Sequence, residues 1–282
     1  MTTSSHPADR LSYAIDRVDA PLCVGIDPVQ DKLPSELQGM KQIEGIGEFC
    51  KGIIEAVASI AAAVKFQSAC FERLGSKGIA LLGDLRQLAS DSELQIVLDA
   101  KRGDIGISAE HYAAAATADG PCDWITVNPY LGIDGIVPFL DAGLGVFCLV
   151  RTSNPSGDEV QKQLLHDCRT VSDSIADLLA ITGSNYIGNL GMSSLGAVVG
   201  ATKTEELIGL RDRMPKQIFL MPGIGAQGAT PSSVECCFGD GYGALVTASR
   251  SVIYPESNKD WQSDIYEAAT KLAGELKVVE NE

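Results

Sequence analysis

Eight short apolar runs are spaced along the whole chain, and they constrain its fold more than any other feature of the sequence. Most are continuously apolar rather than alternating, which is typical of strands buried on both faces, as in a parallel sheet. We therefore expect eight strands, mostly parallel. The runs cover residues 22–27, 62–66, 94–100, 124–128, 145–150, 196–201, 217–223 and 244–249.

The segments between these runs carry apolar stripes at helical spacing. One stripe joins Phe49 to Ile60, a second falls within 164–179, and a third follows the eighth run over 261–276. Eight strand–helix alternations over about 250 residues match the usual size of a (β/α)₈ or TIM barrel, which is the α/β fold that we predict. A doubly wound open sheet with extra strands is the alternative.

No Pro/Ser-rich linker or change in composition divides the chain. We therefore expect a single barrel domain over residues 1–282, with its core at about residues 20–276 after a short N-terminal extension. The longest connection is the segment 152–195, which we expect to hold a helix and an active-site loop.

The formal net charge of −15 limits the kinds of partner that such a chain can bind. Nucleic acid and anionic membranes both require a basic surface, so neither is expected as a partner. An anionic ligand would have to be bound locally, by a few basic side chains and backbone N–H groups.

The cellular setting follows from what the sequence lacks. It shows no secretory signal and no apolar stretch near the roughly 18 residues of a membrane span. Its eight cysteines form no CxxC pair, and its three histidines are far apart, so reduced thiols and no zinc site are expected. We predict a cytoplasmic protein.

The most informative stretch is LDAKRGDIGIS, residues 98–108. Asp99 and Lys101 are two residues apart at the end of a strand, so their side chains share a face, and Asp104 follows after a glycine. Carboxylates on both sides favour the protonated lysine, which is a poor Schiff-base nucleophile but a good proton donor. With Lys65 from the preceding run, these residues form an alternating Lys/Asp/Lys/Asp set. A purely structural salt-bridge network is the other interpretation.

The seventh run leads into MPGIGAQGAT, residues 221–230, where three glycines free backbone N–H groups to face an anion. Arg250 follows the eighth run, and the loops after strands seven and eight of a barrel often bind phosphate. We therefore predict a phosphate site, with a simple turn and a surface arginine as the alternative. The stretch RTSNPS could present Ser153 and Asn154 to the amide edge of a ligand, or could be an ordinary turn.

Seven separated motifs occur in an order and spacing that resemble a known family. They are VKFQ, DAKRGDIG, VNPYLG, VRTSNPS, VVGAT, PGIGAQG and ASRS. Over about residues 10–275, the chain is similar to orotidine 5′-phosphate decarboxylases, specifically to their longer bacterial-type subfamily. The resemblance implies a TIM barrel, commonly a homodimer, that converts orotidine 5′-monophosphate (OMP) to uridine 5′-monophosphate (UMP) and CO₂. This reaction is the last step of de novo pyrimidine synthesis and uses no metal or organic cofactor.

The resemblance also implies a role for each residue of the Lys/Asp set. Asp99 would crowd the departing carboxylate, and Lys101 would protonate the developing C6 carbanion. Lys65 would order the network and contact the ribose. Asp104 would cross the dimer interface into the neighbouring subunit's site.

Substrate binding is implied at further positions. Asp27 would bind a ribose hydroxyl, and Ser153 the pyrimidine edge. Gln227 and Arg250, with the glycine loop at Gly225, would hold the phosphate. Ser108 stands where many relatives carry threonine, and a contact from the neighbouring subunit is expected there.

Three other functions remain open from the sequence. A hexulose-phosphate synthase or a ketogulonate-phosphate decarboxylase has a similar Asp-x-Lys-x-x-Asp signature, but needs magnesium. A non-catalytic phosphate-binding barrel is a second possibility, although it has no reason to keep two like charges near its ligand. A class I aldolase is a third, which the protonated state expected of Lys101 disfavours.

Overall fold

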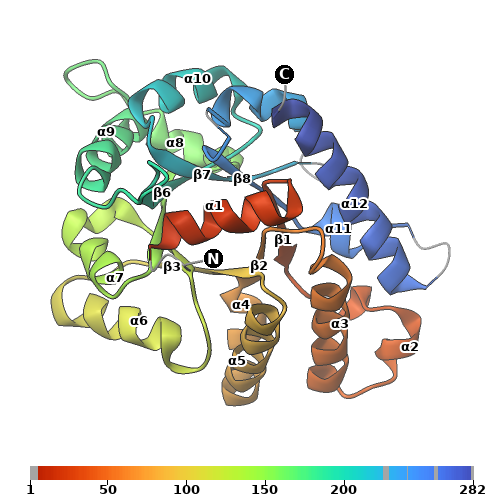
Figure 1. Cartoon of the computed structure of the whole chain (residues 1–282). Helices are drawn as coiled ribbons and strands as arrows, with labels where there is room; N and C mark the ends of the chain where they lie inside the picture. Colours follow the sequence, from red (N-terminus) through yellow and green to blue (C-terminus); the bar gives the residue numbers. More distant parts are fainter. Residues whose placement is uncertain (1–5, 225–228, 240, 257–259, 281–282) are drawn as a thin grey trace.

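In a computed structural model of the chain, which describes residues 6–224, 229–239, 241–256 and 260–280, eight parallel strands form a closed barrel. Each strand pairs with its neighbours in sequence, and β8 returns to pair with β1, as Figure 1 shows. The predicted (β/α)₈ barrel is therefore confirmed. The strands are β1 (Leu22–Ile26), β2 (Ala63–Gln67), β3 (Gln95–Arg102), β4 (Trp124–Val127), β5 (Gly145–Arg151), β6 (Ser193–Val199), β7 (Gln217–Pro222) and β8 (Ala244–Ala248).

Helices surround the barrel and pack against the outer faces of the strands. The α-helices are α1 (Pro7–Val18), α2 (Ser35–Gln38), α3 (Gln42–Val57), α4 (Ser68–Glu72), α5 (Gly75–Asp91), α6 (Gly106–Ala118), α7 (Val137–Asp141), α8 (Asp158–Gln161), α9 (Val171–Gly183), α10 (Thr204–Arg213), α11 (Arg250–Ile253) and α12 (Trp261–Glu280). Short 3₁₀ turns are η1 (Gln30–Lys32), η2 (Pro129–Leu131), η3 (Ile133–Gly135), η4 (Pro155–Gly157) and η5 (Pro231–Cys237). Within these described residues, no helix is both long and apolar enough to span a membrane.

The predicted apolar stripe within 164–179 begins too early, because α9 starts only at Val171. Thr170 caps this helix: its hydroxyl accepts a hydrogen bond from the N–H of Asp173, whose carboxylate accepts one from the N–H of Thr170. This reciprocal capping box fixes the start of the helix. Leu164 precedes it in an antiparallel bridge with Thr170 and is exposed.

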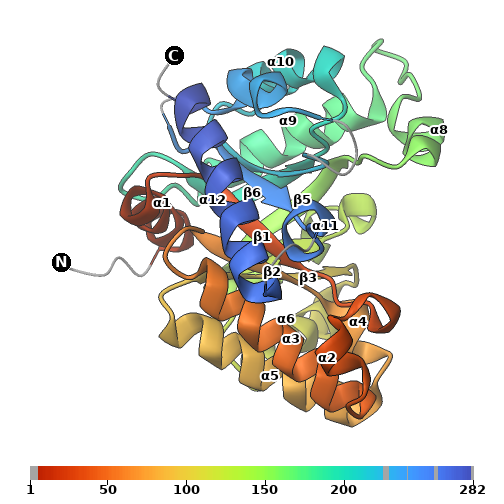
Figure 2. The same cartoon turned by 90° about the vertical axis from the view of Figure 1, so that its right-hand side faces the viewer.

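The N-terminal extension is a helix that closes one end of the barrel. Helix α1 crosses the N-terminal ends of the strands (Figure 1), and in the turned view it lies at the end opposite α8 and α11 (Figure 2). Its Leu11 and Ile15 are buried in one cluster with Trp124 and Phe147, whose rings stack 4.4 Å apart. The core therefore begins before residue 20, where we expected it to start.

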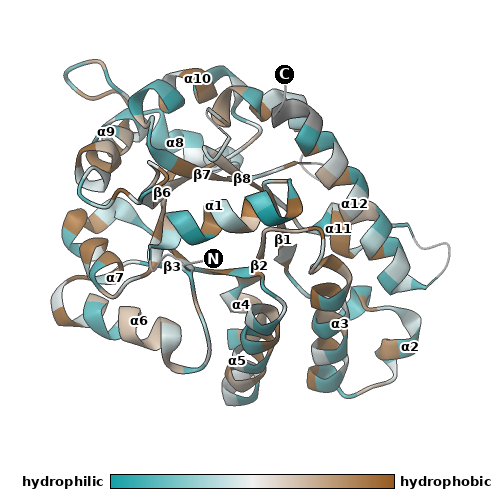
Figure 3. Ribbon diagram, in the orientation of Figure 1, coloured by the Kyte–Doolittle hydropathy of each residue, from teal (hydrophilic) through white to brown (hydrophobic). Residues whose placement is uncertain are grey.

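Two apolar cores hold the barrel together. The larger lies between the strands and the surrounding helices, and the smaller fills the barrel interior above α1. In Figure 3, strands β6 and β7 are largely hydrophobic, while α1 shows both hydrophilic and hydrophobic residues. All eight cysteines are free, and four of them are fully buried, as expected for reduced thiols that pack in a core. Among the described residues, α1 and the inner apolar cluster fill the N-terminal end of the barrel, and the cavity inside the strands opens at the C-terminal end.

Candidate active site

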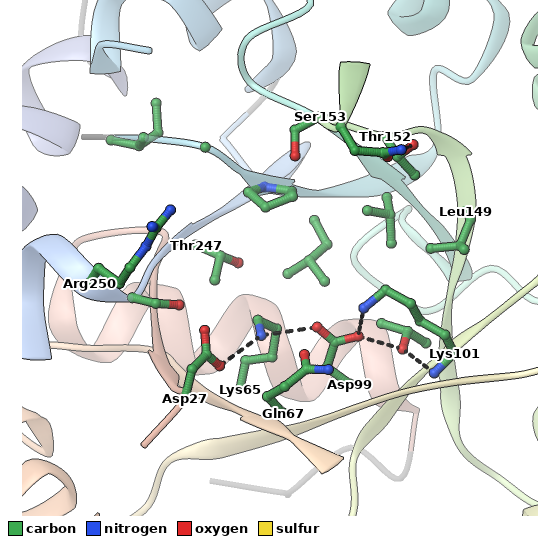
Figure 4. A pocket seen from close by; sticks show the side chains of 18 residues that line it. Asp27, Lys65, Gln67, Asp99, Lys101, Leu149, Thr152, Ser153, Thr247 and Arg250 are labelled. Atoms are coloured by element: carbon green, nitrogen blue, oxygen red, sulfur yellow. Dashed lines mark hydrogen bonds and ion pairs between the residues drawn. The ribbon is translucent and has the colours of Figure 1, made fainter. Parts of the chain in front are cut away.

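The C-terminal ends of the strands surround a cavity of about 290 Å³ (Figure 4). One wall is charged and is formed by the ends of β1, β2 and β3. The floor opposite is apolar and includes Leu149, Val198 and Leu220 from β5, β6 and β7. This division places a charged cluster beside a patch that excludes water.

Asp99 is the centre of the charged wall. One carboxylate oxygen, Oδ2, accepts a hydrogen bond from Lys65 Nζ at 3.0 Å. The other, Oδ1, accepts from Lys101 Nζ at 2.5 Å and from Thr126 Oγ1 at 2.9 Å. Asp27 Oδ1 lies 3.6 Å from Lys65 Nζ on the far side of that lysine (Figure 4). The predicted association of Lys65, Asp99 and Lys101 is therefore present.

The two lysines decide the protonation state of Asp99. Burial by itself would raise the pKa of this carboxyl, but the charges of Lys65 and Lys101 outweigh it and lower the pKa to about 2. Burial would likewise lower the pKa of Lys65, but Asp27 and Asp99 raise it above its ordinary value. At neutral pH, Asp99 is thus a carboxylate and Lys65 an ammonium.

Lys101 reaches the cavity because β3 is irregular at its end. The backbone of Lys101 has a φ of 46°, in the left-handed region that non-glycine residues rarely adopt. Its side chain remains 47% exposed, whereas that of Lys65 is buried at 7%. Lys101 is therefore the cation of the pair that a bound ligand meets directly.

The loop after β5 covers the apolar side of the cavity with Thr152, Ser153 and Asn154. Gly200, at the end of β6, lets this loop approach, because a Cβ there would lie 3.0 Å from the backbone nitrogen of Ser153. A side chain at this position would therefore force Ser153 or its own backbone to shift. Ser153 is thus placed where the sequence predicts a ligand contact.

Arg250 begins α11 and lines the cavity at the end opposite Lys101 (Figure 4). Gly223 and Ile224 from the end of β7 line the cavity too. Gly225 and Gln227, which the sequence assigns to the same phosphate site, lie outside the described residues.

Two predicted site residues do not line this cavity. Asp104 is half-buried in the loop before α6, where its carboxylate accepts a hydrogen bond from the N–H of Ile105. Ser108 lies in the first turn of α6. Neither residue is among those that surround the cavity within one chain.

Sequence reasoning missed Thr126, which bonds Asp99 and lines the cavity. Its signal was present: it is the one hydroxyl within the apolar strand WITV. Leu149, Val198 and Leu220 carried no such signal, because an apolar residue in a buried strand looks the same whether it faces a ligand or a helix.

Among the described residues, no group of three or more His, Cys, Asp or Glu side chains is arranged to hold a metal ion. Asp27 and Asp99 are the carboxylates that line the cavity, and an ammonium lies between them.

The chain is similar to known proteins over most of its length. The sequence model of the "Orotidine 5′-phosphate decarboxylase / HUMPS family" matches residues 20–235. The orotidine 5′-phosphate decarboxylase of Rhodopirellula baltica is 35% identical over 298 residues, covering 96% of this chain and 98% of the relative. That of Herpetosiphon aurantiacus is 39% identical over 255 residues, covering 89% of each.

Solved structures agree with these relatives. A crystal structure from Streptomyces avermitilis, ascribed to the same activity, superposes with a TM-score of 0.86 and 34% sequence identity. It covers 100% of this chain, which covers 98% of that structure in turn. The match in sequence extends over most of the chain, and the match in fold over all of it. The chain belongs to the orotidine 5′-phosphate decarboxylase / HUMPS family.

Proposed function

We propose that the protein decarboxylates OMP to UMP and CO₂, the last step of de novo pyrimidine synthesis in the cytoplasm. The observation that carries the proposal is the carboxylate of Asp99 held between Lys65 and Lys101 at the wall of the cavity. The family to which the chain belongs supports this activity, and so do the names of the similar proteins.

The reaction breaks the bond between C6 of the pyrimidine and its carboxylate. Asp99 lies beside that carboxylate, and their repulsion is relieved as neutral CO₂ leaves. The bonding electron pair stays on C6, where the ammonium of Lys101 becomes more favourable as negative charge develops. This stabilisation is realised mainly in the transition state. Lys101 Nζ then gives its proton to C6, and solvent restores the proton to the amine.

The apolar floor contributes to the same step. The side chains of this floor (Leu149, Val198 and Leu220) cannot solvate a carboxylate. Neutral CO₂ needs little solvation, so its contact with them costs little free energy. Charge interactions are also stronger where water is excluded, so the floor increases the effect of Asp99 and Lys101 on the reacting carbon.

The rest of the cavity binds the remainder of the nucleotide. Arg250 binds the phosphate, together with Gln227 and the backbone at Gly225. This end of the cavity is remote from Lys101 (Figure 4), so phosphate binding can hold the substrate in place without touching the reacting carbon. Ser153 contacts the pyrimidine edge, and Asp27 binds a ribose hydroxyl.

We also propose a homodimer, in which Asp104 and Ser108 of one subunit complete the site of the other. An apolar surface beside Asp104 supports it. Ile107 in α6 and Tyr130 in η2 are 68% and 85% exposed, and Ile105 and Leu131 are exposed within two residues of them in the chain. A patch of exposed apolar side chains often marks a protein–protein interface.

A spectrophotometric assay of OMP loss, with and without EDTA, tests the reaction. Fast turnover that EDTA does not change is the expected result. Turnover of OMP that EDTA abolishes would contradict a metal-independent mechanism. Magnesium-dependent turnover of a sugar phosphate, without turnover of OMP, would instead indicate the enzymes that share the signature. No turnover, with UMP still bound, would indicate a non-catalytic barrel, and trapping by borohydride would indicate a Schiff-base aldolase.

A further inference from the structure

The hydroxyl of Thr126 joins the side chain of Asp99 to the backbone of Lys101. Thr126 lies on β4 and is only 1% exposed. Its Oγ1 lies 2.9 Å from Asp99 Oδ1 and 2.9 Å from the backbone nitrogen of Lys101. Both contacts are made inside the barrel, immediately below the predicted proton donor.

The chemistry of the three groups fixes the direction of both hydrogen bonds. Asp99 is ionised and can only accept, so the single hydroxyl proton of Thr126 points to it. The N–H of Lys101 can only donate, so it uses a lone pair of the same hydroxyl. The hydroxyl therefore donates to Asp99 and accepts from Lys101, and a side chain without a hydroxyl loses both contacts at once.

The hydroxyl also takes the place of a missing backbone partner. Strand pairing is regular at Leu98 with Ile125 and resumes at Arg102 with Val127. Between these pairs, β3 contains more residues than β4, so β3 forms a bulge. Within the bulge, the N–H of Lys101 donates to the side chain of Thr126 instead of to the backbone of β4. Bulges of this kind re-aim side chains beside active sites.

The bulge is where Lys101 adopts its left-handed backbone conformation, with a φ of 46°. A non-glycine residue remains there only when its surroundings hold it. The bond from its N–H to Thr126 is a contact that acts on this peptide directly.

We propose that Thr126 is a positioning residue, which sets the carboxylate of Asp99 and the backbone of Lys101 in the arrangement needed for proton delivery. The proposal rests on the decarboxylase function proposed above. Thr126 does not itself carry a proton to the substrate; it acts through Asp99 and Lys101.

Two substitutions that separate the hydroxyl from the methyl group test this role. Thr126→Val keeps the branched shape and removes the hydroxyl, whereas Thr126→Ser keeps the hydroxyl and removes a methyl group. We expect T126V to lower kcat for OMP by about 10²-fold, the loss associated with a misplacement of about 1 Å. KM for OMP and the affinity for UMP should stay within about threefold of the wild type, because no substrate contact is removed. T126S should recover most of the wild-type kcat.

Thermal unfolding of both variants shows whether a loss of kcat comes from misplaced side chains or from a less stable fold. If T126V does not fold, Thr126→Ala takes its place, since it removes the same hydroxyl without placing a second methyl group against Asp99. Wild-type kcat in T126V, or an equal loss of kcat in T126S and T126V, would overturn the proposal. So would a rise in KM with kcat unchanged, because that would mean a binding role.

A crystal structure of T126V makes the outcome independent of the reaction assigned to the enzyme. The expected change is a shift of the Asp99 carboxylate or of the Lys101 backbone away from its left-handed conformation. An unchanged Asp99–Lys101 arrangement would overturn the positioning role even if the wild type decarboxylates OMP. A wild type without activity on OMP would overturn the proposed function alone, and the structure would still decide the role of Thr126.

Discussion

At the scale of single residues, the site depends on one carboxylate held between two ammonium groups. Asp99 is buried, and a buried carboxylate ordinarily takes up a proton; Lys65 and Lys101 reverse that preference. The same contacts that keep Asp99 charged also fix where Lys101 Nζ lies. Stability and chemistry are therefore coupled through the same three side chains.

Lys101→Ala removes the proposed proton donor. Turnover of OMP should fall by about 10⁴-fold, at the upper end of what a general acid contributes, because Lys65, the other lysine among the described residues that line the cavity, is buried. Binding of UMP should remain measurable. Steady-state kinetics and calorimetry check this, and near-normal turnover would show that another group supplies the proton.

Arg250→Ala should affect binding rather than chemistry. A charge-assisted hydrogen bond is worth about 1.5–3 kcal/mol, so KM for OMP should rise by about ten- to 100-fold. The value of kcat at saturating OMP should change much less than in Lys101→Ala. Comparing orotidine with OMP provides the control, since the nucleoside lacks the phosphate and should not distinguish the variant from the wild type.

The pKa of Asp99 predicts how stability changes in acid. Its pKa is about 2 in the folded protein, against an ordinary value of 3.8, so the folded state binds this proton more weakly. The resulting stabilisation, about 2 kcal/mol, is complete above about pH 4 and is lost as pH falls towards 2. Asp99→Asn cannot titrate, so its unfolding free energy should vary less steeply with pH over that range. Denaturant titrations at several pH values give the unfolding free energy of both proteins. An equally steep dependence of that free energy on pH in the wild type and in Asp99→Asn would contradict the prediction.

At the scale of secondary-structure elements, the loop after β5 is held by a buried arginine. Arg151 is fully buried and forms ion pairs with Glu206 of α10 and Asp158 of α8. Its Nη1 also donates to Gln161 Oε1 at 3.0 Å. The loop that carries Ser153 is thus tied to two helices.

Gln161 transmits this anchoring to the loop itself. Its Oε1 accepts from the N–H of Thr152 at 2.9 Å, and its Nε2 donates to Thr152 Oγ1 at 2.7 Å. Gln161→Ala should therefore loosen the neighbouring Ser153 and raise KM for OMP by several-fold to about tenfold, as expected for one or two lost neutral hydrogen bonds.

Two comparisons isolate that effect. Inhibition by ribose 5-phosphate should not change in Gln161→Ala, because this ligand lacks the pyrimidine. Gln163→Ala is the matched control: Gln163 is exposed, and its Nε2 bonds only the backbone oxygen of Glu159 in its own helical region. A similar rise in KM in both variants would exclude a specific role for Gln161.

At the scale of the whole molecule, the barrel is closed by α1 at one end and is open at the other. Asp104 lies outside the cavity of its own chain, and the apolar surface beside it is where we propose that the second copy binds. Ile107→Lys should therefore separate the proposed dimer and reduce turnover together. Analytical ultracentrifugation and the OMP assay measure the two effects.

Ile181→Lys is the control for this prediction. Ile181 in α9 is 72% exposed, close to the 68% of Ile107, but belongs to a different face of the barrel. This variant should keep the oligomeric state and the turnover of the wild type. A wild type that sediments as an active monomer would contradict the role proposed for Asp104.

The sequence by itself determined the barrel and the centre of its site. Eight buried strand patterns alternating with helices allow few other topologies, and the carboxyl ends of parallel strands must meet at one end of a closed sheet. The strand pattern alone therefore predicts that Lys65 and Asp99 lie together, although they are 34 residues apart in the chain.

Only the tertiary structure decided how these groups are held. The bulge of β3 at Lys101, the contact of Thr126 with Asp99, the burial of Arg151 against Glu206 and the closure of the barrel by α1 leave no periodic pattern in the sequence. Each depends on side chains from different elements meeting at a distance of a few ångströms. Periodicity shows which face of an element is buried, but not which polar groups meet once it is buried.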